Sequence, residues 1–317
     1  MAALFQEAGY EIVDFHEKAD VYLINTCTVT HLSDRKSRQM IRRAGHENPD
    51  ATVVVCGCYA QTAAGELAGL EEVDLIIGTN ERHRVVEAVE EFRQNHVRKT
   101  YLPSDDELFY YEDLPHERVS GMTRAYVKVQ EGCDQFCAYC IIPYARGPLR
   151  SRSEADTVAE INALVAKGYK EVILTGIHLG AYGRGVKDET TDLTGLCKRI
   201  LEETEIERLR LGSLEGIEVT EELIDMIAEN PRMAKHLHLP LQSGCDRTLA
   251  AMRRPYDTEE FRNTMRAIRK RVPNIAITTD LMVGFPDETE EDFKESLVFC
   301  NVIAFANMHI FKYSMRG

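Results

Sequence analysis

Residues 131–147 read EGCDQFCAYCIIPYARG and place three cysteines, Cys133, Cys137 and Cys140, in a C-x3-C-x2-C pattern. Three thiolates at this spacing can bind three irons of a cubane iron–sulfur cluster and leave the fourth iron without a protein ligand. Such an open iron can bind a substrate or cosubstrate, as a catalytic zinc ion does at its free position. The pattern therefore predicts a cluster that takes part in chemistry.

A zinc site, a disulfide or a core role fits these cysteines less well. A structural zinc site normally has four ligands in two separated pairs, and no second pair follows in the sequence. Disulfides are not expected, because the sequence shows neither a signal peptide nor a secretory context. Three cysteines within eight residues, beside Gly132 and Gly147, are also not a pattern of core residues.

Composition places the chain among ordinary globular proteins. Its 317 residues are enough for two domains or one large α/β barrel. Hydrophobic residues make up 44% and charged residues 28%, and no apolar run is long enough to span a membrane. Nine cysteines without a secretory signal favour the reducing cytoplasm, where thiols bind metals or take part in chemistry.

The net charge argues against a broad attraction to nucleic acid. With 38 basic and 52 acidic residues, the formal charge is −14. A nucleic-acid substrate would need a local basic patch or a separate binding module. Charge alone predicts a different kind of partner.

Residues 1–95 alternate apolar runs with helical patterns. Strands are expected at Val21–Asn25, Thr52–Cys56 and Val73–Ile77, and helices near 33–47, 60–70 and 81–92. Strands that recur with helices between them predict a Rossmann-like parallel sheet with right-handed crossovers. A further helix at 2–8 has no strand before it, so we expect the chain to begin inside a β/α unit.

Cys27 and Cys58 each follow the end of one of these strands. Open parallel sheets bind ligands at the carboxyl ends of their strands. Either cysteine by itself is a common small core residue, and the residues alone leave a metal site and a structural role equally open.

Residues 96–118 are polar and irregular, with Pro103 and Pro115, and are expected to be a linker. Residues 119–317 then contain six strand candidates with helices between them. The strands are Ala125–Val129, Glu171–Thr175, Arg208–Leu211, His236–Leu239, Ile275–Asp280 and Asn307–Phe311. Six β/α units are too few for a closed eight-stranded barrel and predict an open partial (β/α)6 barrel. The cysteine loop follows the first strand, at the face where barrel active sites lie.

Several stretches together resemble the radical SAM (S-adenosylmethionine) methylthiotransferases, in the MtaB-like branch that acts on tRNA. They are NTCTVT (25–30), GCYAQ (57–61), KVQEGCDQFCAYCIIPYARGPLRSR (128–152), LTGIHLGAYG (174–183), LRLGSLEG (209–216), HLHLPLQSGCD (236–246), DLMVGFPDETEEDF (280–293) and HIFKYS (309–314). The cysteine run gives only the superfamily. GIHLGAYG and RGPLRSR separate this branch from relatives that modify isopentenyladenosine or a ribosomal protein.

The resemblance implies two [4Fe–4S] clusters. The cluster of Cys133, Cys137 and Cys140 would bind SAM through its open iron, and Cys27 and Cys58 would ligate an auxiliary cluster. One SAM would supply a methyl group, and a second would give the 5′-deoxyadenosyl radical. The implied product is the 2-methylthio derivative of N6-threonylcarbamoyladenosine next to the tRNA anticodon. An external electron donor and a sulfur donor are implied as well, whereas a membrane is not an expected partner.

The sequence departs from the family pattern at both ends. The family has a third auxiliary-cluster cysteine upstream of the point where this sequence starts, and a C-terminal TRAM module, a small RNA-binding β-barrel, beyond the point where it stops. We expect both to lie outside the sequence. Cys56 could replace the third ligand if its strand stayed extended to Cys58, because both side chains would then share a face. A buried strand cysteine is the simpler interpretation.

Residues at the predicted strand ends are further candidates for the cofactor site. They are Tyr139 in the cysteine loop, and Gly176, His178, Ser213, Glu215, Gln242, Val283 and Gly284 after successive strands. His178 could instead be a loop histidine bonded to backbone, and Ser213 and Glu215 could cap the next helix. Gly284 would allow close backbone approach to a ligand.

Arg146, Arg150 and Arg152 are candidates for contact with tRNA phosphate, although solvated surface arginines are an alternative. Two further functions stay open at this point. The chain could be a radical SAM enzyme that modifies a protein, which its acidity suits better. It could also be an inactive fragment that carries a cluster or binds RNA.

Overall fold

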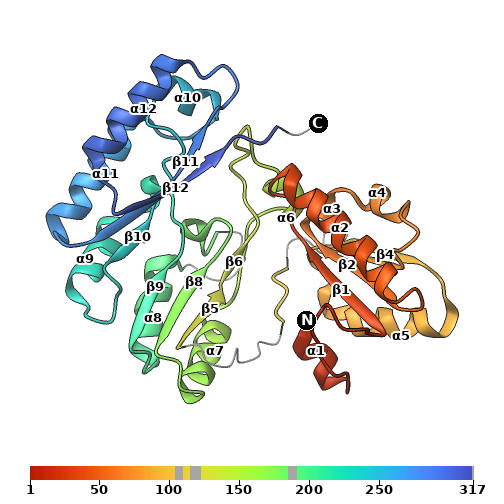
Figure 1. Cartoon of the computed structure of the whole chain (residues 1–317). Helices are drawn as coiled ribbons and strands as arrows, with labels where there is room; N and C mark the ends of the chain where they lie inside the picture. The colour runs from red at the N-terminus through yellow and green to blue at the C-terminus, as the bar shows by residue number, and fades with distance from the viewer. Residues whose placement is uncertain (104–109, 115–122, 185–190, 316–317) are drawn as a thin grey trace. The chain divides into compact units, whose positions relative to one another are not determined.

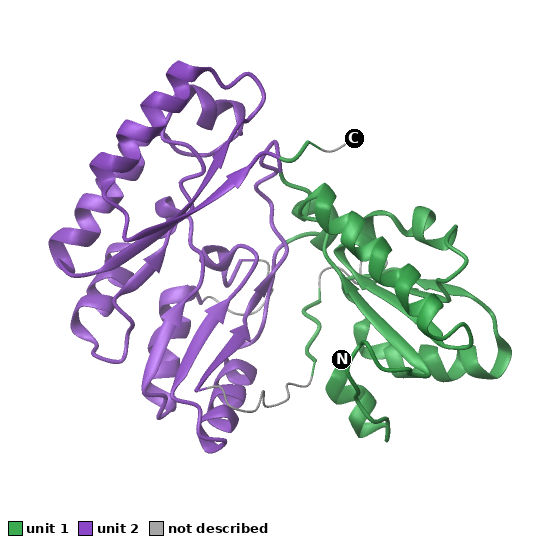
Figure 2. Cartoon of the chain, viewed as in Figure 1, with its two compact units in different colours: residues 1–118, 140–148, 314–317 green, residues 119–139, 149–313 purple. Residues whose placement is uncertain are grey.

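The computed structural model describes residues 1–103, 110–114, 123–184 and 191–315. The chain forms two compact units, coloured separately in Figure 2. Unit 1 consists of residues 1–118, 140–148 and 314–317, and unit 2 of residues 119–139 and 149–313. In the described part, no helix is both long enough and apolar enough to cross a membrane.

Unit 1 is built on a parallel sheet with the strand order β1-β2-β3-β4 (Figure 1). The strands are β1 (Val21–Thr26), β2 (Thr52–Gly57), β3 (Leu75–Ile77) and β4 (Lys99–Tyr101). The helices are α1 (Ala2–Glu7), α2 (His31–Glu47), α3 (Cys58–Thr62), α4 (Ala64–Ala68), the 3-10 turn η1 (Arg82–Arg84), α5 (Val85–Asn95) and α6 (Ile142–Arg146).

Every residue of β2 is buried, because helices cover both faces of the sheet. Val53 and Val55 pack with Ile41 of α2 on one face. Val54 packs with Val89 of α5 on the other. A strand buried on both faces is expected to read as a continuous apolar run, and TVVVC does.

Among its described residues, unit 2 has six parallel strands in two sheets, β5-β8-β9 and β10-β11-β12. The strands are β5 (Arg124–Lys128), β8 (Glu171–Thr175), β9 (Arg208–Leu211), β10 (His236–His238), β11 (Ala276–Val283) and β12 (Asn307–Lys312). Parallel bridges from Leu209 to Met233 and from Ser213 to His238 continue the pairing between β9 and β10. The result is the expected open partial (β/α)6 barrel.

The helices of unit 2 lie outside the strands and share one core with them (Figure 1). They are α7 (Glu154–Ala166), α8 (Leu193–Glu203), α9 (Glu221–Glu229), α10 (Asp246–Ala251), α11 (Thr258–Arg271) and α12 (Glu290–Ile303), with the 3-10 turns η3 (Leu179–Ala181) and η4 (Gly216–Glu218). Five of the helices begin at a side chain that accepts a hydrogen bond from a free backbone N–H of the first turn. These capping residues are Ser153, Asp192, Thr220, Asp257 and Thr289.

The six barrel strands and the first three strands of unit 1 confirm the sequence prediction: β8 and β9 match it at both ends, and no strand end differs by more than three residues. The helix expected at 60–70 is instead two short helices, because Ala63 leaves helical geometry at φ −134° and ψ 35°. Strand β4 lies inside the stretch expected to be a linker. Its three residues are polar or half-buried, so they carry no apolar run to reveal them.

Leu196 of α8 is 0% exposed and belongs to the core of unit 2. We predict that Leu196→Ala lowers the stability of unit 2 by about 2–5 kcal/mol, because it leaves a cavity among rigid neighbours. Lys198→Ala, two residues further along the same helix at an exposed position, should change stability by less than about 0.5 kcal/mol. Thermal unfolding followed by circular dichroism measures both, and equal effects of the two variants would contradict this packing of α8.

Candidate cluster and cofactor site

The cysteine loop lies between the two strands of a short antiparallel ladder, β6 (Gln130–Glu131) and β7 (Arg150–Ser151). The buried Gln130 side chain donates to the carbonyls of Glu131 and Gly132, at 2.7 and 3.0 Å, and accepts from the backbone N–H of His178 at 2.7 Å. One amide therefore joins the start of the cysteine loop to the loop after β8. This fixes where the first cysteine emerges.

All nine cysteines are free thiols. Cys133 Sγ lies 3.8 Å from His178 Nδ1, and Cys137 is buried with Sγ 3.3 Å from Arg254 Nη1. Cys140 is the first residue of the segment that groups with unit 1. Three free thiols on one loop are the donor set that a [4Fe–4S] cluster with one open iron requires, so the residues present fit such a cluster.

His178 is 5% exposed and is held on several sides. Its Nε2 lies 2.8 Å from Glu218 Oε1, and its Nδ1 lies 3.6 Å from Asp134 Oδ1. Burial on its own lowers the pKa of His178, but Cys133 and Glu218 outweigh it and raise the pKa to about 10. The side chain of His178 thus contacts the cysteine loop, while its backbone N–H bonds to Gln130.

Arg254 reaches Cys137 because of the way α10 ends. Arg253 adopts left-handed geometry at φ 57°, its N–H bonds to the carbonyl of Ala250, and the N–H of Arg254 bonds to that of Leu249. This pair of bonds is a Schellman motif, which reverses the chain after a helix. The backbone N–H of Ala138, next to Cys137, also bonds to the carbonyl of Met252 at 3.0 Å.

The predicted cofactor residues lie at the carboxyl ends of successive strands of unit 2. Gly176 follows β8, Ser213 and Glu215 follow β9, and Gln242 follows β10. Val283 ends β11, and Gly284 follows it. The parallel bridges Ser213–His238 and Gln242–Leu281 extend the sheet to this edge. Gly284 has φ 73°, a conformation that glycine adopts readily, and Gln242 has the less usual value of 66°. The structure therefore brings these residues to one edge.

Cys27 and Cys58 also share an edge, at the carboxyl ends of β1 and β2. The two strands pair in parallel with Thr26 opposite Gly57, so each cysteine follows a paired residue. Cys27 is exposed and Cys58 is buried. Arg146 of α6 donates from Nε to Cys58 Sγ at 3.1 Å.

Cys56 lies in the apolar core with Val54 and Leu75 and is 0% exposed. Burial raises the pKa of its thiol to about 12. The extended geometry that would place Cys56 and Cys58 on one face ends at Gly57, where φ is 96° and ψ is −161°. Cys58 is already the first residue of α3, so Cys56 is a core cysteine.

The three arginines expected to contact phosphate do not form an exposed cluster. Arg150 is 1% exposed and lies 3.7 Å from Glu131, and Arg152 is 7% exposed and pairs with Glu160. Arg146 contacts Cys58. The prediction is wrong for Arg150 and Arg152, because both side chains are buried, which their proximity to the loop in the sequence does not reveal.

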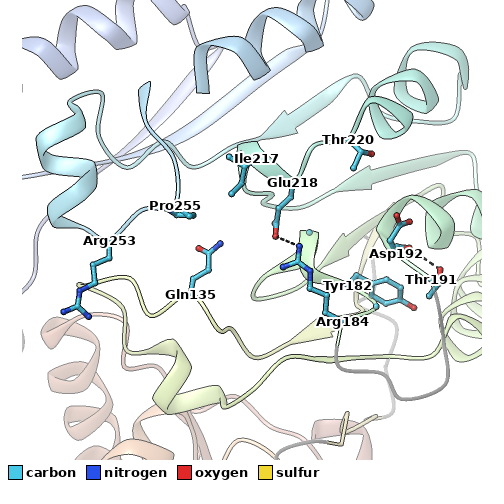
Figure 3. Close-up of a pocket in the computed structure, with 12 residues that line it drawn as sticks. Gln135, Tyr182, Arg184, Thr191, Asp192, Ile217, Glu218, Thr220, Arg253 and Pro255 are labelled. Carbon is cyan, nitrogen blue, oxygen red and sulfur yellow. Dashed lines mark hydrogen bonds and ion pairs between the residues drawn. The ribbon is translucent and has the colours of Figure 1, made fainter. Parts of the chain in front are cut away.

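The sequence interpretation also missed residues on distant segments. Gln135, Glu218 and Arg253 line a cavity of about 700 Å³. Figure 3 shows these residues, with Arg184 turned toward Glu218. Arg184 lies 3.5 Å from Glu218. No spacing in the sequence links Glu218 or Arg254 to the cysteines. The sequence signal for Glu218 is its place as an acidic residue in η4, the turn that follows β9, where barrel active-site residues lie.

Gly57 is in a backbone region that only glycine populates readily, and an added Cβ would lie 2.4 Å from the carbonyl oxygen of Thr26. We predict that Gly57→Ala lowers the stability of unit 1 by about 1–3 kcal/mol or more. Gly65→Ala, at an exposed position of α4 with open space around it, should be neutral or stabilising by about 0.5–1 kcal/mol. Chemical denaturation of both variants tests this, and a stable Gly57→Ala variant would contradict it.

Arg150 faces Glu131 in the interior, and Lys128 lies 2.7 Å from the same carboxylate. Removing one partner of a buried ion pair costs about 3–5 kcal/mol, and Lys128 should keep the loss near the lower value. We therefore expect Arg150→Gln to lower the melting temperature clearly. Arg208→Gln, at an exposed position of β9, serves as the control, and equal melting temperatures for the two variants would refute a structural role of Arg150.

Comparison with protein families gives two matches. Residues 127–300 match the Radical SAM superfamily, and residues 1–78 match a family described as Uncharacterized protein family UPF0004. Together these matches include both cysteine sites.

Curated relatives align along nearly the whole chain. The chain is 42% identical to threonylcarbamoyladenosine tRNA methylthiotransferase MtaB of Bacillus subtilis, over 99% of this chain and 69% of that protein. It is 41% identical to MtaB of Aquifex aeolicus, over 98% of this chain and 75% of that protein. A tRNA-2-methylthio-N(6)-dimethylallyladenosine synthase of Clostridium perfringens is 34% identical over 72% of its length.

Solved structures share the fold at low identity. The radical SAM methyltransferase TsrM of Kitasatospora setae superposes with a TM-score of 0.68 at 16% identity, over 98% of this chain. The cobalamin-dependent radical SAM enzyme OxsB gives 0.57 at 12% identity, over 90% of this chain. This chain spans 66% of the first solved chain and 44% of the second.

Proposed function

Because the chain belongs to the radical SAM tRNA methylthiotransferases, we propose that it attaches a methylthio group to C2 of N6-threonylcarbamoyladenosine next to the tRNA anticodon. The identity of 42% along 99% of the chain to a protein named for this substrate carries the proposal. Relatives named for dimethylallyladenosine are less similar, at 33–36%.

Radical SAM proteins use a [4Fe–4S] cluster and SAM. In this proposal Cys133, Cys137 and Cys140 hold the cluster, and its open iron takes the methionine end of SAM. When bound, the cluster and SAM would supply the 5′-deoxyadenosyl radical that removes the hydrogen from C2. The free thiols on one loop support this assignment.

The protein's own residues hold and orient these groups. Gln130 and His178 fix the loop that carries Cys133, through a 2.7 Å backbone contact and the 3.8 Å approach to its sulfur. The residues proposed to bind SAM are Tyr139, Gly176, His178, Ser213, Glu215, Gln242, Val283 and Gly284. The described members of this set lie in the cysteine loop or at the carboxyl ends of β8, β9, β10 and β11, where α/β barrels bind ligands.

An auxiliary [4Fe–4S] cluster at Cys27 and Cys58 is part of the proposal, with a third ligand other than the buried Cys56. The common edge of β1 and β2 and the contact of Arg146 with Cys58 support a negatively charged group there. The reaction also requires a tRNA, a sulfur source and an external electron donor, which we expect the cytoplasm to supply. Arg146 acts at this cysteine in the proposal rather than at tRNA phosphate.

The test is to incubate the anaerobically reconstituted, reduced chain with SAM and with tRNA that carries N6-threonylcarbamoyladenosine. We expect 5′-deoxyadenosine and the 2-methylthio nucleoside, both measured by mass spectrometry. Cys133→Ser should abolish both products, because it removes a ligand of the SAM cluster. Cys58→Ser should abolish only the methylthio nucleoside.

A tRNA carrying dimethylallyladenosine is the matched control substrate. Methylthiolation of that tRNA alone would overturn the assigned substrate. 5′-Deoxyadenosine without change in either tRNA would overturn the tRNA substrate altogether and favour a protein substrate.

A further inference from the structure

Arg254 is a buried cation that touches one of the three motif cysteines. Its side chain is 3% exposed, and its Nη1 donates to Cys137 Sγ at 3.3 Å. The Schellman end of α10 sets the direction of the residue, and the Ala138–Met252 bond holds the cysteine loop to the same segment. The contact therefore follows from backbone geometry at both of its ends.

The guanidinium group is fixed by partners on its remaining sides. It forms an ion pair with Glu215, and Tyr256 Oη accepts from Nε at 3.1 Å and from Nη2 at 3.0 Å. Tyr139 Oη lies 3.5 Å from Nη1. A planar group with this many fixed donors cannot turn away from Cys137 without taking this partner from the half-buried carboxylate of Glu215.

We propose that Arg254 is a positioning residue that raises the reduction potential of the cluster held at Cys137, and that Glu215 limits this effect. The inference rests on the proposed function only for the presence of that cluster. Reduction adds one electron from the external donor and one negative charge to the cluster. A cation hydrogen-bonded to a ligand sulfur stabilises the more negative state, while a nearby carboxylate opposes it.

The experiment is a redox titration of the full chain, reconstituted anaerobically and followed by electron paramagnetic resonance. A Cys58→Ser background leaves a single cluster to report. At a fixed solution potential, Arg254→Gln should lower the ratio of reduced to oxidised cluster at least tenfold, equal to a shift of about 59 mV for one electron. Glu215→Gln should shift the midpoint in the opposite direction, and Arg254→Lys should restore part of the loss.

Arg208→Gln is the matched control, because it removes the same charge from an exposed position of β9 outside the site. Its midpoint should equal that of the parent. Arg254→Gln could take up less iron than the parent because the fold is disturbed. The midpoint potential of Glu215→Gln then tests the proposal, because a purely structural ion pair predicts no upward shift of that potential. Unchanged midpoints in both variants at full iron content would overturn the proposal.

Iron content separates this inference from the proposed function. If the parent chain binds no iron, the cluster does not form. That result would overturn the proposed function and this inference together. A parent with about four irons and a signal altered by SAM, but with equal midpoints in all variants, would leave the function intact and refute the role of Arg254.

Discussion

Parallel pairing of the six strands of unit 2 is the constraint on which the candidate site depends. Parallel strands point the same way, so their carboxyl ends meet at one edge. The loops that carry Cys133, His178, Glu215 and Gln242 follow different strands and still arrive together. The sheet of unit 1 applies the same constraint to Cys27 and Cys58, which lie far apart in the sequence.

Burial of charge explains how the edge is organised. Arg254 and His178 are both nearly enclosed, and an enclosed charge is stable only with a partner. Glu215 and Glu218 provide these partners from the same turn after β9. The short segment 215–218 thus anchors both side chains that contact motif cysteines, and its geometry is linked to theirs.

Much of the fold could be predicted from the sequence, because short apolar runs such as VYLIN and TVVVC, separated by helical patterns, are typical of the strands of a parallel sheet. The edge positions of Cys27 and Cys58 could be predicted from these strands, and the cluster site from the spacing of its three cysteines. The partners could not. Nothing local indicates that Arg150 turns inward or that Arg254 reaches a sulfur, because both depend on packing between segments far apart in the chain.

The segment 140–148 groups with unit 1, whereas the residues on either side of it group with unit 2. Neither unit is thus a single continuous piece of the gene. A fragment ending at residue 118 would lack α6, so Cys58 would lose the guanidinium group of Arg146, and the Thr79 hydroxyl would lose the carbonyl of Ala145 to which it donates. Recombination after residue 118 of two such genes would therefore combine α6 from one protein with the remainder of unit 1 from the other. Residues of α6 and the residues before position 118 that they contact are therefore expected to change together in evolution.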